Sequence, residues 1–107
     1  MNRQEVVKIV KRLIKKWDKM GYSPYSINCG NCDSFAQEIL DQCPQGDIMW
    51  GEDVPEFFIT KVDPLGHCFF KFKGYYYDSE TPLGTRYPDG LKYYQRIPKN
   101  EKVFYRF

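Results

Sequence analysis

Residues 67–78 read His67-Cys68-Phe69-Phe70-Lys71-Phe72-Lys73-Gly74-Tyr75-Tyr76-Tyr77-Asp78. Two aromatic-rich runs, 67–72 and 75–77, flank Lys73-Gly74, and this pattern predicts two antiparallel strands joined by a hairpin. If the turn has two residues, Phe69 faces Asp78 and His67 faces Glu80. His67 and Asp78 then lie on one face of the sheet as diagonal neighbours, near enough for the carboxylate to orient the imidazole.

Further short runs of aromatic and β-branched residues lie on both sides of this hairpin. They predict strands at Ile48–Trp50, Phe57–Val62, Leu91–Ile97 and Val103–Phe107. Glycines and prolines between the runs mark the turns. The chain after Pro44 is therefore expected to form an antiparallel sheet.

The chain before Pro44 has helical periodicity. Apolar residues recur at helical spacing from Gln4 to Met20, with lysines and an arginine over the remaining surface, which predicts an amphipathic helix whose apolar face packs on a core. A loop then leads to a second helix, about Asn31 to Gln42, closed by Cys43-Pro44. N-terminal helices packed on an antiparallel sheet make an α+β fold.

Length and composition suit one globular domain, residues 1–107. The chain has 107 residues, of which 42% are hydrophobic and 18% aromatic, and this is enough for one core but not for two. A net charge of +2 is too small to indicate a nucleic-acid-binding domain, and the nine tyrosines are normal residues of a β-sheet. No apolar run approaches the roughly 18 residues of a membrane span, and the start lacks the apolar stretch of a signal peptide. We therefore expect a cytoplasmic protein whose cysteines stay reduced.

Three residues could together form a nucleophilic site. Cys32 falls in the first turn of the second predicted helix, where unpaired N–H groups and the helix dipole favour a thiolate. His67 is the only histidine, and the predicted hairpin brings it beside Asp78. A thiol, an imidazole and a carboxylate in this order are typical of a nucleophile, a general base and an orienting acid.

Three stretches carry a resemblance to a known family: Cys29-Gly30-Asn31-Cys32 before Phe35-Ala36, then Gly66-His67-Cys68-Phe69, then Tyr75-Tyr76-Tyr77-Asp78. With them, the chain resembles the papain-like fold superfamily in its small, circuit form, as in bacterial cell-wall amidases of the NlpC type and in transglutaminase-like proteins. The resemblance spans about half of the chain, roughly residues 28 to 80. It implies a hydrolase, cysteine peptidase, amidase or acyl transferase without a cofactor.

The resemblance also implies roles for individual residues. Cys32 would be the nucleophile, His67 the base and Asp78 its partner, acting on a peptide, protein or peptidoglycan-type amide. Glu80 would replace Asp78 if the register differed by one pair. The Cys32 backbone N–H would supply one oxyanion donor, and the second would come from one of three nearby residues: Asn28, Asn31 or Tyr25.

Two other interpretations of the same residues stay open. Cys29 and Cys32 have the spacing of half a zinc site, which Cys43 with His67 or Cys68 could complete. Against this, His67 and Cys68 are adjacent in a strand, so their side chains point to opposite faces. The negative charge of Asp33 beside Cys32 would raise the pKa of the thiol, and this favours a weak or inactive binding module on the same fold.

Overall fold

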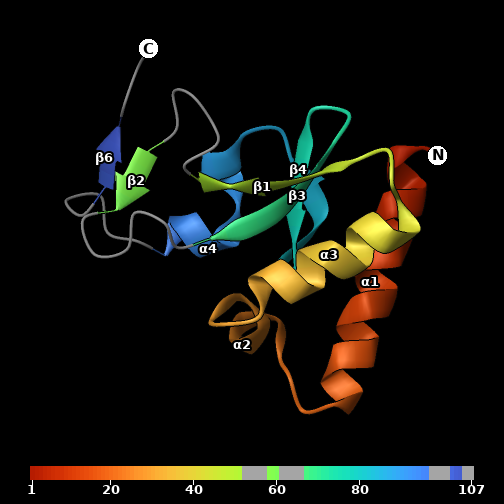
Figure 1. Cartoon of the computed structure of the whole chain (residues 1–107). Helices are drawn as coiled ribbons and strands as arrows, with labels where there is room; N and C mark the ends of the chain where they lie inside the picture. The colour runs from red at the N-terminus through yellow and green to blue at the C-terminus, as the bar shows by residue number, and fades with distance from the viewer. Residues whose placement is uncertain (52–57, 61–66, 97–101, 105–107) are drawn as a thin grey trace.

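The structure of this protein is a computed structural model, and it describes residues 1–51, 58–60, 67–96 and 102–104. The elements in chain order are α1 (Arg3–Lys19), α2 (Pro24–Asn28), α3 (Cys32–Gln42), β1 (Asp47–Trp50), β2 (Phe58–Thr60), β3 (Cys68–Phe72), β4 (Tyr75–Asp78), β5 (Thr81–Thr85), the 3-10 turn η2 (Pro88–Gly90), α4 (Lys92–Gln95) and β6 (Lys102–Phe104). Strands β1, β3, β4 and β5 form an antiparallel sheet in the order β1-β3-β4-β5, while β2 and β6 pair as a second sheet (Figure 1). The predicted α+β class is confirmed.

Helices α1 and α3 pack side by side on one face of the four-stranded sheet (Figure 1). The apolar stripe of α1 is buried there, as the periodicity predicted, against α3 and the inner residues of β3 and β4. A capping box between Asn2 and Glu5 starts α1 and satisfies free N–H groups of its first turn. Glu38 on α3 joins the two helices, because it binds both Lys16 and the indole N–H of Trp17.

The β3–β4 hairpin has the predicted two-residue turn. Phe72 pairs with Tyr75 and Phe70 with Tyr77, which is the register that Lys73-Gly74 requires. Both turn residues have positive φ, 48° at Lys73 and 77° at Gly74, the signature of a type I′ turn. Side chains therefore alternate between two faces: Phe70 and Phe72 contact α1 and α3, whereas Phe69 faces away from them.

The opposite face of the sheet is covered by α4, and here one prediction is wrong. Leu91–Ile97 was predicted as a strand, but its residues Lys92–Gln95 form a helical turn. A helical turn places Leu91 and Tyr94, three residues apart, on one side, where both are buried against Phe69. Ile97 lies outside the described residues, as do Phe57, 61–62 and 105–107 of two other predicted strands.

Two further elements were not predicted. Residues 24–28 lie in a predicted loop but form α2, which starts at an N-cap serine, Ser23, followed by proline. Pro82 and Gly84 predict a turn at residues 81–85, yet this segment forms β5. This strand lies at the edge of the sheet, where proline is tolerated because no second neighbour needs its N–H.

Within the described ranges, no helix combines the length and the apolar character needed to cross a bilayer.

Candidate active site

Cys32 is the first residue of α3 and lies at the end of the sheet where β3 begins. Its side chain packs with Ala36 and Cys68, but 9% of the residue remains exposed. The N-cap residue, Asn31, makes no side-chain cap, although the Ser34 N–H of the first turn is bound to Asp33 Oδ1. Such a helix start stabilises negative charge on a nearby atom.

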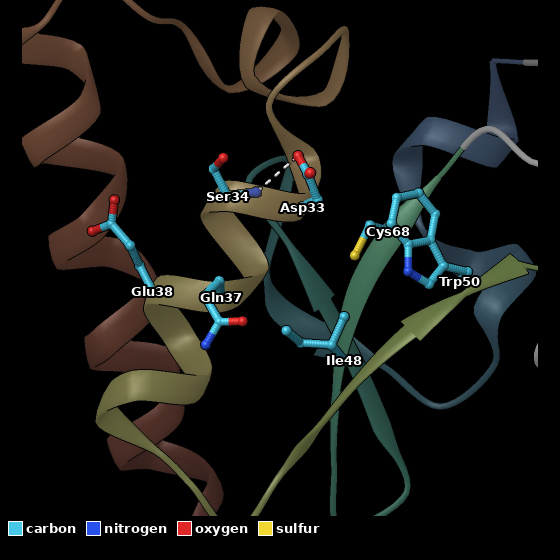
Figure 2. A pocket seen from close by; sticks show the side chains of 7 residues that line it. All are labelled: Asp33, Ser34, Gln37, Glu38, Ile48, Trp50 and Cys68. Atoms are coloured by element: carbon cyan, nitrogen blue, oxygen red, sulfur yellow. Dashed lines mark hydrogen bonds between the residues drawn. The ribbon is translucent and has the colours of Figure 1, made fainter.

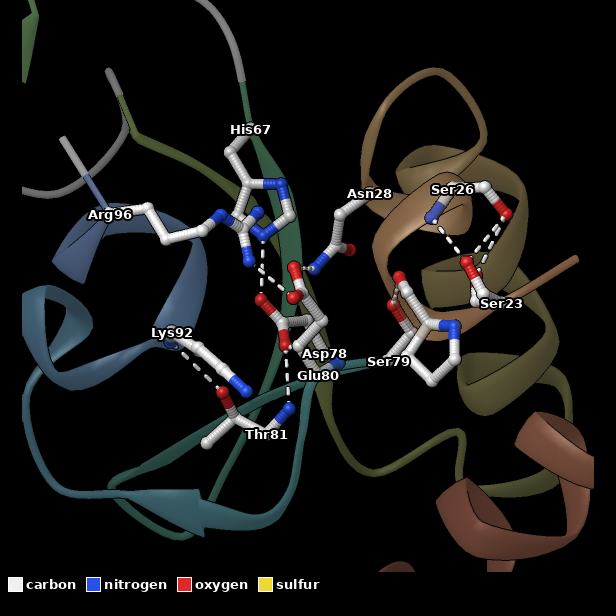
Figure 3. Close-up of polar contacts among 11 residues, drawn as sticks. Ser23, Ser26, Asn28, His67, Asp78, Ser79, Glu80, Thr81, Lys92 and Arg96 are labelled. Atoms are coloured by element: carbon white, nitrogen blue, oxygen red, sulfur yellow. Dashed lines mark hydrogen bonds and ion pairs between the residues drawn. The ribbon is translucent and has the colours of Figure 1, made fainter.

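His67 and Asp78 are in direct contact, as the hairpin register predicted. The imidazole Nε2 lies 2.8 Å from Asp78 Oδ2, and both side chains are buried, at 0% and 3% exposure (Figure 3). The other carboxylate oxygen, Oδ1, accepts the backbone N–H groups of Glu80 and Thr81, each at 2.9 Å. Asp78 is therefore held in place by the tight turn between β4 and β5, and it in turn orients the imidazole.

Aromatic rings enclose the imidazole. Tyr93 of α4 stacks on His67 with ring centroids 4.0 Å apart and planes 12° from parallel. Tyr94 meets the ring edge-on at 5.6 Å, and Phe69 lies at 5.9 Å. These rings keep water from the bond between His67 and Asp78, which strengthens that bond because the local dielectric is low.

The imidazole and the thiol interact electrostatically. Because Nε2 is bound to Asp78, the ring nitrogen left for Cys32 is Nδ1. This nitrogen is buried and has no well-aligned hydrogen bond to any described residue. The contact between Nδ1 and the thiol is thus looser than a formed hydrogen bond, the usual condition of a catalytic pair before substrate binds.

Both pKa values shift toward an ion pair. Burial opposes ionisation of Cys32, but the interaction with His67 and a hydrogen bond with the Cys68 backbone outweigh it, so the pKa of the thiol is lowered. Burial likewise opposes protonation of His67, but the hydrogen bond with Asp78 and the interaction with Cys32 outweigh it, so the pKa of the imidazole is raised. A thiolate beside an imidazolium is the combination that these shifts favour.

Glu80 does not replace Asp78 as the partner of His67, which was the alternative for a register that differs by one pair. Instead it accepts a hydrogen bond from Asn28 Nδ2 at 2.9 Å and forms an ion pair with Arg96 (Figure 3). The same Arg96 lies over the rings of Tyr25 and Tyr93. Glu80 therefore links α2 to the end of α4 and holds both beside the His67–Asp78 pair.

The three candidate oxyanion donors are placed differently. Asn28 is buried, with 4% exposure, and lines a pocket together with Cys32. Tyr25 is 57% exposed, and a hydrogen bond with Cys29 raises the pKa of its phenol. Asn31 is the N-cap of α3. Of the three, only Asn28 shares a pocket wall with the thiol.

This pocket has a volume of about 520 Å³ and opens beside Cys32. Its wall includes Asn28, Cys32, Asp33, Trp50 and Tyr93, which come from α2, α3, β1 and α4. The thiol is thus accessible from a concave surface large enough for part of a peptide.

The four ligands of the alternative zinc site are not brought together. Cys43 is fully buried just after the end of α3, whereas Cys32 begins that helix, and 11 helical residues separate the two by roughly 16 Å. Cys29 is exposed. Among the described residues, no three or more histidine, cysteine or acidic side chains form a group that could hold a metal ion.

Sequence reasoning missed Tyr93, Trp50 and Arg96. Tyr93 was assigned to a strand, and its position over the imidazole depends on the helical turn of α4. Trp50 ends β1 and reaches the pocket because β1 pairs with β3. Arg96 acts through Glu80, and no sequence pattern indicates that pairing.

Comparison of the chain with protein-family models, with curated proteins and with solved structures found no match.

Proposed function

We propose that this protein carries out thiol-dependent acyl chemistry at an amide, with Cys32 as nucleophile, His67 as general base and Asp78 as the acid that orients it. The observation that carries this proposal is the buried 2.8 Å contact between His67 and Asp78, together with the interaction of the same imidazole with the Cys32 thiol at a helix start. The sequence resembles the papain-like superfamily, and on the basis of that resemblance and of this constellation of residues we propose the same fold family.

The chemistry would proceed in two steps. The Cys32 thiolate attacks the carbonyl carbon, and the oxyanion that forms is stabilised by the Cys32 backbone N–H. The C–N bond then breaks, and the imidazolium of His67 gives its proton to the leaving nitrogen, which leaves a thioester on Cys32. Water, or an amine in a transfer reaction, attacks the thioester after His67 removes its proton, and the thiolate is released.

We assign the second oxyanion donor to Asn28. Its side-chain nitrogen carries two hydrogens, of which one is bound to Glu80, and the residue lines the pocket beside Cys32. Because Glu80 is itself held by Arg96, the orientation of the amide is set before substrate arrives. This pre-organisation is what oxyanion stabilisation requires.

The substrate class in this proposal is a peptide, protein or peptidoglycan-type amide. A nucleophilic thiol has to remain reduced, which fits the cytoplasmic location expected from the sequence. An inactive binding module on the same fold is the outcome that the following test would favour if Cys32 proved unreactive.

The first test is selective alkylation at pH 6. A brief iodoacetamide pulse on the native protein, read out by peptide mass spectrometry, should modify Cys32 about tenfold or more faster than Cys29, because only Cys32 is paired with a base. Cys29 is a matched internal control, since it is exposed and only three residues away. His67→Gln should remove the difference. Equal, slow labelling of both cysteines in the native protein would contradict the proposal.

A further inference from the structure

Two pockets adjoin each other at the start of α3. The first contains Cys32, and the second, of about 540 Å³, lies between α3 and the strands β1 and β3 (Figure 2). Asp33 and Trp50 line both pockets, so they stand where the two meet. We call the two pockets together the Asp33 groove. A substrate bound at Cys32 would extend along it past these two residues.

The charge of the groove is negative. Neither pocket has a lysine or arginine among the described residues that line it. Glu38 lines the second pocket, but its two oxygens are already bound to Lys16 and to the indole N–H of Trp17. Asp33 is exposed, and among the residues that the structure describes its one hydrogen bond is accepted by Oδ1, from the backbone N–H of Ser34 at 2.9 Å (Figure 2). Asp33 is thus the carboxylate of the groove that can bind a ligand.

This carboxylate works against the chemistry proposed for its neighbour. Burial and the charge of Asp33 both raise the pKa of the Cys32 thiol, although other contacts outweigh them. A cation bound to Asp33 would cancel its charge and so increase the thiolate fraction of Cys32. Trp50 offers an indole at the same place, a surface that also attracts cations and their alkyl chains.

We propose that the Asp33 groove binds a cationic group of the substrate, a lysine or arginine side chain near the scissile amide, and that Asp33 pairs with it. This inference rests on the proposed function and adds a substrate class to it. Asp33 is then a specificity-determining residue, and Trp50 supports the alkyl part of the side chain.

The test uses three methanethiosulfonates that share one reactive group and differ in charge. In each reaction the Cys32 thiolate attacks the sulfenyl sulfur, a mixed disulfide forms and methanesulfinate leaves. We compare the rates at Cys32 for the ethylammonium, methyl and ethylsulfonate reagents. The ratio of cationic to anionic rates should fall about tenfold in Asp33→Asn, because removing one exposed negative charge slows the cationic reagent by about threefold and speeds the anionic reagent by about threefold.

The matched control is Asp41→Asn, the same change on the same helix but outside both pockets. It should leave the ratio within about twofold, since a screened charge at the far end of α3 contributes little. Asparagine at position 33 keeps the oxygen that accepts the Ser34 N–H, so the helix start is preserved. An unchanged ratio in Asp33→Asn would overturn the inference.

A pair of peptide vinyl sulfones then tests recognition of a side chain. For each of the three positions before the electrophile, one peptide of the pair carries lysine there and the other carries norleucine, an uncharged chain of similar length. Cys32 adds to the vinyl carbon, and the neighbouring carbon takes a proton from His67. At one position at least, lysine should accelerate labelling several-fold in the native protein but not in Asp33→Asn. Equal labelling at all three positions would overturn the inference.

The neutral reagent separates this inference from the proposed function. If the methyl reagent reacts with Cys32 at pH 6 no faster than with a free thiol, the proposed function fails, while the charge ratio still decides whether the groove selects cations. If the neutral reagent is fast and the ratio does not depend on Asp33, the inference fails and the proposed function stands.

Discussion

His67 shows how neighbouring groups decide the state of a single buried residue. With no exposed surface, the ring would normally lose its charge, because burial penalises the imidazolium. Asp78 reverses this outcome, since a carboxylate at 2.8 Å favours the protonated ring. The other oxygen of Asp78 accepts two backbone N–H groups, which hold the carboxylate in position. The charge state that the His67 imidazole favours thus depends on Asp78, whose carboxylate makes three contacts.

The pH dependence of Cys32 alkylation should follow from these contacts. The pKa of Cys32 is lowered and that of His67 is raised, so both shifts favour a thiolate beside an imidazolium, and alkylation should extend to pH values below the usual pKa of cysteine. Asp78→Asn keeps the shape but removes the charge, which lowers the pKa of His67 and raises that of Cys32. The alkylation rate at pH 6 should fall about tenfold for each unit by which the pKa of Cys32 rises, because the thiolate fraction falls by that factor.

This prediction has a control on the same helix as the thiol. Asp41→Asn should give the native pH profile, since Asp41 is exposed and its side chain binds Gln37. Circular dichroism should show both variants folded at the pH values used. Native and Asp78→Asn profiles that coincide would mean that Asp78 does not act on the thiol through His67.

At the scale of elements, the β3–β4 hairpin positions the site. Its two-residue turn sets the register, and the register decides that His67 and Asp78 share a face. A turn with one more residue would move Asp78 to the α3 face, where Phe70 and Phe72 form the core. The backbone at Lys73 and Gly74 is left-handed, so the turn depends on residues that tolerate positive φ.

Gly74→Ala should destabilise the fold by about 1 kcal/mol, because a side chain at φ 77° is strained even where there is space for it. Urea unfolding followed by fluorescence measures this difference. Gly30→Ala is the control, since Gly30 is likewise exposed with nothing within 4 Å of an added Cβ, but its φ is not positive. A loss in Gly74→Ala no greater than in Gly30→Ala would contradict a strained turn.

At the scale of the whole molecule, the site lies at the junction of both layers. The core between α1, α3 and the sheet holds the start of α3, and with it Cys32, at one end of β3. The smaller cluster on the other face, formed by Phe69, Leu91 and Tyr94, holds α4 over His67. The thiol belongs to one layer and the imidazole to the other, so the pair forms only when both layers are packed.

Ile39 anchors α3 in the larger core and is fully buried. Ile39→Ala should cost about 2 to 5 kcal/mol, as buried aliphatic truncations do. Alkylation of Cys32 at pH 6 should keep its native rate under conditions where the variant is folded, because Ile39 lies two turns from the thiol.

The control for this truncation is Leu83→Ala. Leu83 is 62% exposed on β5, so its loss should change the stability by less than about 0.5 kcal/mol. Chemical denaturation of both variants measures the contrast. Equal stabilities would contradict the assignment of Ile39 to the core.

The sequence by itself determined what depends on local periodicity and turn geometry. Helices α1 and α3, the α+β class and the β3–β4 register follow from spacings of a few residues and from one Lys-Gly turn. The approach of His67 to Asp78 followed as well, because strand parity links residues 11 positions apart once the turn is known. The position of Cys32 at a helix start is equally local.

The tertiary structure decided what depends on long-range packing. Residues 91–95 have aromatic residues typical of a strand. Burial of Leu91 and Tyr94 against Phe69 favours the helical turn α4 instead, and this turn brings Tyr93 over His67. The link from Asn28 through Glu80 to Arg96 joins three segments, the outer two of which are 68 residues apart in the sequence. The position of Trp50 beside Asp33 likewise depends on how β1 pairs and how α3 packs. Such contacts have no local signal, because their free energy comes from surfaces that meet only after the helices and the sheet have packed together.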